Sequence, residues 1–372
     1  MPKYFLYHMR KTVVRFVIMA LMLCLFVNST VYSKYSYYGG EHTSVSLTVF
    51  SVFGVVAPFV VAALEFSQFM NRRNLDTWFS LPISRTNLFL VHFINGAVQL
   101  SAAFIVGVLV AAVKFAAAGI SLGRLMTYTP IGICLMLFSY MLLTFLFLSA
   151  NNLFDGCVFM AGAVLIPYNL YSIFKSFYML FNPQNGNQIF FTGNIPGLPF
   201  NGCGIFNLIV VASERYTDLL KKDLGELSVD SALWTSARAT VTKFSMPQLL
   251  LWIMICVGAL AGAIFIFNKK KTENVSGVSD SWFGYRVLIP ICTAGSLTSS
   301  FLTRAVIGEE LLATIVSVIA IIPTIIGAFI AYVIYRRGIK FKLPDYLTLA
   351  GLVVYYIVCA IIFSSVAPAT PW

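Results

Sequence analysis

The sequence predicts an all-α fold, a polytopic transmembrane helical bundle of about nine spans. The first observation is compositional: the 372 residues are 59% hydrophobic and only 10% charged, whereas an ordinary soluble domain is roughly 25% charged. The second is that the apolar runs approach the roughly 20 residues that a helix needs to cross a bilayer, without the alternation of barrel strands. These observations exclude a soluble globule, a disordered chain and a fibrous protein.

Nine uninterrupted apolar stretches are long enough to be candidate spans. They cover residues 13–33, 44–66, 88–113, 127–150, 157–180, 246–268, 286–303, 311–335 and 345–366. The first stretch follows Lys and Arg, as in a signal peptide, but its length and the eight later spans predict a retained helix.

The distribution of charge predicts the orientation. With a cytoplasmic N-terminus, 15 of the 25 Lys and Arg and six of the 14 Asp and Glu lie in inside segments. The inside segments then carry +9 of the total net charge of +11, in agreement with the positive-inside rule. Nine spans place the C-terminus outside. Because the charge is explained by orientation, and no Arg-rich patch interleaves with aromatic residues, we expect no nucleic-acid partner.

The sequence carries no recognisable motif for catalysis or ATP binding. There is no phosphate-binding G-x-x-x-x-G-K-[ST] loop, and the histidines His8, His42 and His92 lack metal-ligand spacing. Glu65 lies at the inner end of the second span, and no charged residue lies near the centre of a span, which disfavours an ion-coupled transporter. We therefore predict no catalytic residue, no metal and no cofactor in this chain.

The cytoplasmic connection at residues 71–85 predicts a short helix followed by the start of a longer one. Asn74 is a suitable cap for the short helix, and Asp76 falls in its first turn. Pro82 suits the first turn of the next helix, which continues into the third span.

Leu75, Trp78 and Phe79 recur at i, i+3 and i+4, so they form one apolar face of the short helix. A water-facing helix with such a face needs a partner. One interpretation is an anchor in the lipid headgroup layer. The other is a knob that docks into a groove on a cytoplasmic protein.

Polar residues recur within two spans. His92, Asn95 and Gln99 lie at i, i+3 and i+7 in the third span, and Asn169 lies in the fifth. Such a row can line a path through the membrane, or it can form hydrogen bonds that hold neighbouring helices together. Both interpretations remain open from the sequence.

Two further segments flank the spans. The N-terminal run places His8, Lys11 and Arg15 on one helical face, which predicts either an elbow helix on the inner leaflet or a simple positively charged flank. The extracellular loop at residues 182–245 begins rich in Gly, Pro and Asn and then predicts a helix over about 205–224. It is either a cap over an exit or a covering loop.

The sequence resembles the type 2 ABC (ATP-binding cassette) exporter permeases, in particular the larger Gram-positive members. The resemblance lies in NRRNLDTWFSLPISRTNLF after the second span, in the amphipathic N-terminal run, and in the insertion between the fifth and sixth spans. It covers about residues 1–270 and extends more loosely over 271–372, through YRRGIKF after the eighth span.

The resemblance implies a six-span permease core at residues 1–270 with three additional spans at 271–372. It also implies pairing with a second permease chain, the same or related, and a coupling helix at about 74–81 that contacts separate ATPase subunits. Those subunits, not this chain, would bind ATP and magnesium. The implied coupling residues are Asn74, Leu75, Asp76, Trp78, Phe79, Leu81, Pro82 and Arg85.

The expected function is therefore that of the permease subunit of an ABC exporter in a bacterial cell membrane, surrounded by lipid. It would move an amphipathic, peptide or lipid-like substrate outward. The alternative is a non-transporting sensor or scaffold subunit of an ABC-like complex. A membrane-embedded enzyme is disfavoured because His, Asp, Glu and Cys do not cluster in the sequence at one membrane depth.

Overall fold

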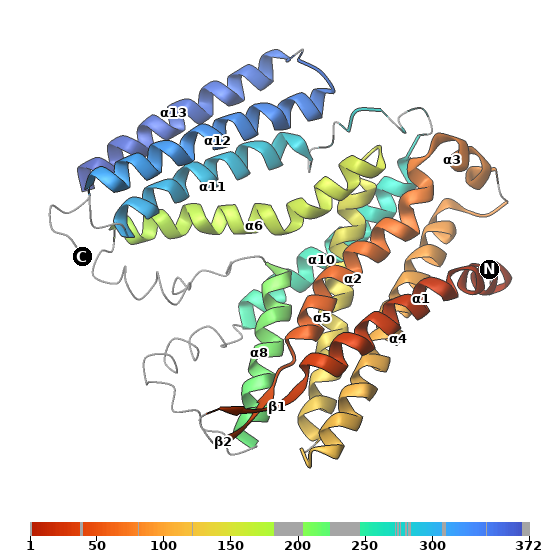
Figure 1. Ribbon diagram of the computed structural model, residues 1–372. Helices are drawn as coiled ribbons and strands as arrows, with labels where there is room; N and C mark the ends of the chain where they lie inside the picture. Colours follow the sequence, from red (N-terminus) through yellow and green to blue (C-terminus); the bar gives the residue numbers. More distant parts are fainter. Residues whose placement is uncertain are drawn as a thin grey trace. The chain divides into compact units, whose positions relative to one another are not determined.

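In its described residues the computed structural model is helical apart from one short hairpin, and the chain forms two compact units (Figure 1). Unit 1 comprises Met1–Leu148 and Ile205–Val275, and unit 2 comprises Ser149–Gly204 and Ser276–Trp372. The structure describes residues 2–37, 40–80, 82–120, 122–181, 204–223, 246–271, 273, 275, 277–279, 281, 284–306, 310–339 and 341–366.

Unit 1 is a helical bundle in which α1 packs on α4, while α2, α8 and α10 pack on α5 (Figure 1). Its elements are α1 (Pro2–Thr30), β1 (Tyr32–Tyr37), β2 (Gly40–Val45), α2 (Thr48–Phe66), the 3₁₀ turn η1 (Ser67–Met70), α3 (Arg72–Phe79), α4 (Arg85–Ala117), α5 (Gly123–Leu148), α8 (Ile205–Asp223) and α10 (Met246–Lys269). Buried Phe50, Phe104 and Tyr128 form part of its core, where their rings contact one another.

Unit 2 is built around α11, which packs on each of its other helices. The elements are α6 (Leu153–Phe181), α11 (Tyr285–Val306), α12 (Glu310–Arg336) and α13 (Leu343–Val366). Small residues allow α6 and α11 to approach closely: a Cβ on Gly162 would meet Leu288, and a Cβ on Gly295 would meet Asn169. Close contact of this kind is a common way for helices to associate in membranes.

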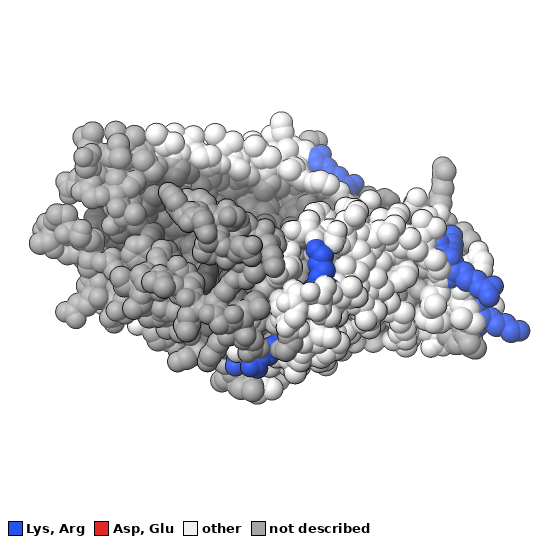
Figure 2. All heavy atoms as spheres, turned by 60° about the horizontal axis from the view of Figure 1, so that its bottom comes forward, with Lys and Arg blue, Asp and Glu red and all other residues white. Residues whose placement is uncertain are grey.

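Seven helices in the described part of the chain are long and apolar enough to cross a bilayer. They correspond to the first six predicted spans and the ninth, so the prediction of an all-α, membrane-embedded protein is confirmed. The other two predicted spans fall on α11 and α12, and Ile321–Arg336 of α12 forms a shorter apolar helical stretch within the described residues. On the face shown in Figure 2 most of the described surface is uncharged, as expected for lipid contact, and several of its Lys and Arg side chains lie together at one end.

The connection between the first two spans differs from the prediction. The first two spans were extended into residues that form an antiparallel hairpin, in which Tyr32 pairs with Val45. Buried apolar residues at the hairpin ends, Val31 and Val45, lengthened the hydrophobic runs. α1 runs without interruption from Pro2, which favours the positively charged flank over a separate elbow helix, the two interpretations that the N-terminal run left open.

The compact units divide the chain differently from the expected boundary at residue 270. The fifth predicted span is α6, and it belongs with α11, α12 and α13 because it packs on α11. Of the predicted extracellular loop, Gly204 and α8 are described, and α8 belongs to unit 1; residues 182–203 and 224–245 and the C-terminal Trp372 lie outside the described residues.

Candidate functional site

The predicted short helix exists as α3, but it begins earlier than expected. It covers Arg72–Phe79, so Asn74 lies within the helix and is exposed, and its predicted capping role was wrong. Asn71 directly precedes the helix in an extended conformation (φ −109°, ψ 123°), which is the usual N-cap geometry. The 3₁₀ turn that ends α2 places Asn71, and not Asn74, at this position.

The start of α4 also differs from the prediction. Pro82 lies before the helix, which begins at Arg85. Ser84 is the cap: its backbone is extended and its hydroxyl accepts a hydrogen bond from the Asn87 N–H at 3.4 Å. A Ser side chain can satisfy a free amide of the first turn, whereas Pro cannot.

The aromatic face of α3 packs against other elements of unit 1. Trp78 is half-buried, and its ring lies 6.2 Å from Tyr4, 6.3 Å from Phe69 and 6.0 Å from His92, measured between ring centroids. The partner that this face requires is therefore supplied by α1, η1 and α4 of the same chain. Trp78 is not a water-facing knob in this structure.

Phe79 has a comparable role beside α10. Its ring lies 6.0 Å from that of Phe267, and the guanidinium of Arg85 stacks over it at 4.2 Å. Arg85 also donates hydrogen bonds to the carbonyl oxygens of Asn268, at 3.0 Å, and Lys270, at 3.2 Å. Arg85 thus joins the start of α4 to the C-terminal carbonyls of α10, which lack partners within their own helix.

Several described side chains of the connection are exposed. Arg72 and Asn74 are exposed on α3, and Pro82 is exposed after it. The side chains of Leu75, Asp76 and Leu81 lie outside the described residues. Next to this segment, Lys270 is buried, with its Nζ 3.2 Å from the Met70 sulfur, and burial lowers the pKa of Lys270 to about 8.

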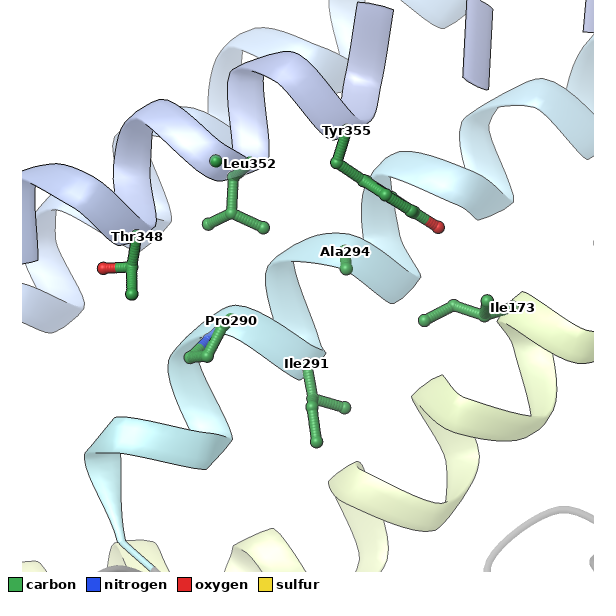
Figure 3. Close-up of a pocket in the computed structure, with 8 residues that line it drawn as sticks. Ile173, Pro290, Ile291, Ala294, Thr348, Leu352 and Tyr355 are labelled. Carbon is green, nitrogen blue, oxygen red and sulfur yellow. The ribbon is translucent and has the colours of Figure 1, made fainter. Parts of the chain in front are cut away.

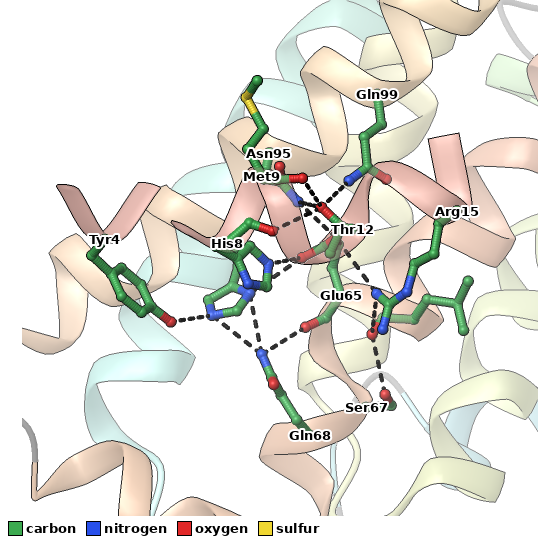
Figure 4. Close-up of polar contacts among 12 residues, drawn as sticks. Tyr4, His8, Met9, Thr12, Arg15, Glu65, Ser67, Gln68, Asn95 and Gln99 are labelled. Carbon is green, nitrogen blue, oxygen red and sulfur yellow. Dashed lines mark hydrogen bonds and ion pairs between the residues drawn. The ribbon is translucent and has the colours of Figure 1, made fainter. Parts of the chain in front are cut away.

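A buried polar cluster lies beneath α3, where α1, α2 and α4 meet (Figure 4). Its centre is Glu65, whose side chain is only 1% exposed. Glu65 Oε2 lies 2.8 Å from His8 Nε2 and 3.2 Å from His92 Nδ1. Arg15, which is partly exposed, reaches Glu65 Oε1 at 3.7 Å. The sequence reading of scattered histidines without metal-ligand geometry is corrected here, because the fold brings two of the three together.

The predicted path-lining residues of the third span belong to this cluster. Asn95 donates to Glu65 Oε1 at 2.9 Å and to Thr12 Oγ1 at 3.1 Å, and Gln99 donates to Thr12 at 2.7 Å (Figure 4). All three residues of the row, including His92, are buried. Their contacts favour the interpretation of hydrogen bonds that hold α1 and α4 together.

Asn169, the fourth predicted path-lining residue, is not brought together with them. It lies in α6 of unit 2, buried, and its amide donates to the Leu165 carbonyl of its own helix at 2.8 Å. Its side chain also fills the space left by Gly295 on α11. This position has the geometry of a packing contact.

Unit 2 has polar networks of its own. Asp155 accepts hydrogen bonds from Ser279 at 2.6 Å and from Tyr285 at 2.8 Å, which connects α6 to α11. Arg336 at the end of α12 donates two hydrogen bonds, at 2.7 and 2.8 Å, to Asp345 in the first turn of α13. Bidentate pairs of this kind have a defined geometry and hold helix ends in register.

An apolar pocket of about 350 Å³ lies in unit 2 (Figure 3). Its walls come from α6, α11 and α13, and they are formed by Ile173, Pro290, Ile291, Ala294, Thr348, Gly351, Leu352 and Tyr355. The Tyr355 hydroxyl pairs with Thr298 at 2.6 Å. The apolar lining suits hydrocarbon better than a polar solute.

The sequence did not reveal Glu65 as the centre of the buried polar cluster, because its partners His8 and His92 are 57 and 27 residues away in the chain. A signal was nevertheless present. Tyr4, His8 and Thr12 recur every four residues and so lie on one face of α1, in the same way that the polar row marks a face of α4. Two polar faces on apolar helices, with a nearby carboxylate, indicate a shared buried site.

Comparisons of the chain with protein-family models, with curated proteins and with solved structures found no match.

Proposed function

We propose that the chain is the membrane-spanning permease subunit of an ABC exporter in a bacterial cell membrane. It would move an amphipathic, peptide or lipid-like substrate outward, with ATP and magnesium bound by separate ATPase subunits and with a second permease chain completing the pathway. The N-terminus would be cytoplasmic. The proposal combines the sequence resemblance with one structural observation, which is the arrangement of α2, α3 and α4.

In this arrangement a short helix connects two long apolar helices and has two different sides. Trp78 and Phe79 pack against α4 and α10 of the same unit, whereas Arg72 and Asn74 are exposed. A helix that is held rigidly by aromatic contacts on one side and is polar on the other can transmit a push from a soluble partner into the membrane helices. This arrangement supports the assignment of α3 as the coupling helix.

We assign different roles to the residues of this segment. Asn74, which is one of the expected coupling residues, and its neighbour Arg72 have exposed side chains that could contact an ATPase subunit. Trp78 and Phe79 would transmit motion to α1, α4 and α10, and Arg85 would keep α4 and α10 moving together through its carbonyl contacts. In this mechanism the helices move as rigid bodies, and no ion has to cross the membrane to drive them.

The test compares outward and inward substitutions in the purified complex. Arg72→Glu together with Asn74→Ala should abolish co-purification of the ATPase while leaving the thermal stability of the permease unchanged. Trp78→Ala should retain the ATPase but lose substrate-stimulated ATP hydrolysis in liposomes. Lys11→Glu is the matched control, because Lys11 is also an exposed cation but lies on α1, near the N-terminal end of that helix.

Two results would contradict the proposal. Normal ATPase co-purification and stimulation in the outward double variant would exclude α3 as the coupling helix. ATPase association without any substrate-dependent turnover, even in the wild-type complex, would instead support a sensor or scaffold subunit.

A further inference from the structure

We propose that His8, Glu65 and His92 form a binding site for a divalent transition-metal ion, with Zn²⁺ as the best fit. The proposal does not depend on transport, because it rests only on the geometry and chemistry of the three side chains. Each offers one ligand atom, and these atoms all lie within 4.8 Å of one another (Figure 4).

The distances within the cluster are close to those of a coordination sphere. Zinc binds nitrogen and oxygen at about 2.0–2.2 Å in tetrahedral geometry, which places neighbouring ligand atoms about 3.3 Å apart. Glu65 Oε2 lies 2.8 Å from His8 Nε2 and 3.2 Å from His92 Nδ1. Both distances are close to this spacing, and all three ligand atoms lie within 4.8 Å of one another, so local movement of the side chains would open the cluster around an ion.

The donor set selects the class of metal. Two imidazoles and one carboxylate are typical ligands of zinc and neighbouring transition metals, whereas magnesium and calcium prefer oxygen ligands alone. Three protein ligands leave a fourth tetrahedral position for water or another small ligand. The position is buried, since His8 is 6% exposed and His92 is fully covered.

The two oxygens of Glu65 have separate partners. Both histidines approach Oε2, while Asn95 donates to Oε1 at 2.9 Å and Arg15 lies 3.7 Å from Oε1. Outer hydrogen bonds of this kind hold a ligating carboxylate in place and leave its other oxygen directed at the ion.

His92 is oriented in the same way. When it binds a metal through Nδ1, the neutral ring carries its proton on Nε2, and the Tyr4 hydroxyl lies 3.2 Å from that atom as an acceptor. Asn95 Oδ1 is buried and has no hydrogen-bond partner among the described residues. It would accept a hydrogen bond from a water molecule in the fourth coordination position.

The three ligands come from three different helices, α1, α2 and α4, so a bound ion would fasten these helices together. The ring of Trp78 contacts both Tyr4 and His92, which places α3 next to the site. Metal binding would therefore stiffen the support on which α3 rests. The same cluster without a metal would be held only by hydrogen bonds and ion pairs.

The experiment measures metal binding to the purified full-length chain after treatment with EDTA. Titration with Zn²⁺ should show one ion bound per chain, and Co²⁺ should produce the visible absorption of a tetrahedral site. Zn²⁺ should also raise the melting temperature of the wild-type protein, because a ligand that binds only the folded state stabilises it.

Variants separate a metal site from a structural network. Glu65→Gln keeps the size of the side chain and should weaken Zn²⁺ binding by at least 100-fold. Tyr4→Phe removes only an outer contact and should weaken binding by roughly 10-fold to 100-fold, as outer-shell changes do. His42→Ala, which alters the one histidine away from the cluster, should bind normally.

Failure would be visible in the wild-type protein alone. Absence of stoichiometric Zn²⁺ binding and of the tetrahedral Co²⁺ spectrum would overturn the proposal, even if Glu65→Gln does not fold. Equal affinity in wild type, Glu65→Gln and a second variant, His8→Gln, would also overturn it, since the metal would then bind elsewhere.

Discussion

Trp78 of α3 and His92 of α4 meet edge to face, with their ring centroids 6.0 Å apart and their planes at 87°. This contact connects a short helix after α2 to the buried cluster around Glu65. It means that the aromatic face of α3 supports the bundle, and that substitutions there affect the stability of unit 1.

Trp78→Ala should lower the stability of unit 1 by about 2 kcal/mol, less than the loss for a fully buried Trp because this side chain is half-buried. The measurement is thermal unfolding in detergent. Asn74→Ala is the control on the exposed side of the same helix and should change little. Equal melting temperatures for wild type and Trp78→Ala would show that the ring contacts contribute no stability.

Arg85→Lys should destabilise the junction of α4 and α10 by about 1–2 kcal/mol. Lysine keeps the charge but cannot reproduce both the stacking on Phe79 and the two hydrogen bonds to the carbonyls of Asn268 and Lys270. Arg72→Lys, at an exposed position, is the matched control. Hydrogen exchange at the last turn of α10 should increase only in the Arg85 variant.

Lys270→Met should change the pH dependence of stability. The pKa of Lys270 is lowered from 10.5 to about 8 by burial, so between these values the unfolded chain binds more protons than the folded chain. Wild-type stability should therefore rise as pH increases from about 8 toward 10.5, by about 3 kcal/mol in total.

Removal of the amine by Lys270→Met should abolish this rise and make the protein more stable near neutral pH. Melting temperatures measured across this range would test it. A wild-type curve that is flat between pH 8 and 10.5 would contradict the depressed pKa.

Gly96→Ala should destabilise the packing of α4 by about 1–3 kcal/mol, the usual cost of overpacking. A Cβ at this position would collide with the Tyr140 hydroxyl and would lie 2.9 Å from Val61 Cγ1. Gly258→Ala in α10 is the matched control, because a Cβ there meets nothing within 4 Å. It should be neutral or slightly stabilising, as Ala favours a helix over Gly.

The apolar helices could be predicted from sequence because each span depends on its own composition. The six spans from α1 to α10 and the last span, in α13, were located without any tertiary information. The hairpin between Tyr32 and Val45 was missed because its ends are apolar and extended the neighbouring hydrophobic runs.

The candidate site was predictable only in part, for a physical reason. Local spacing identified the polar row of α4 and the aromatic face of α3, but not the side to which either one turns. His92 pairs with Glu65, and the ring of Trp78 contacts that of Tyr4, which is 74 positions earlier in the sequence. Contacts of such long range depend on helix packing, which spacing within one helix does not report.

The division of the chain into two units has a consequence for biosynthesis. α6 ends at Phe181, but α11, the helix on which it packs, begins at Tyr285, after α8 and α10 of the other unit. At about 5–20 residues per second, α6 emerges roughly 5–20 seconds before its partner exists. During this interval Asp155 and Asn169 lack their contacts on α11, so newly made chains depend on lipid or on the insertion machinery to shelter α6.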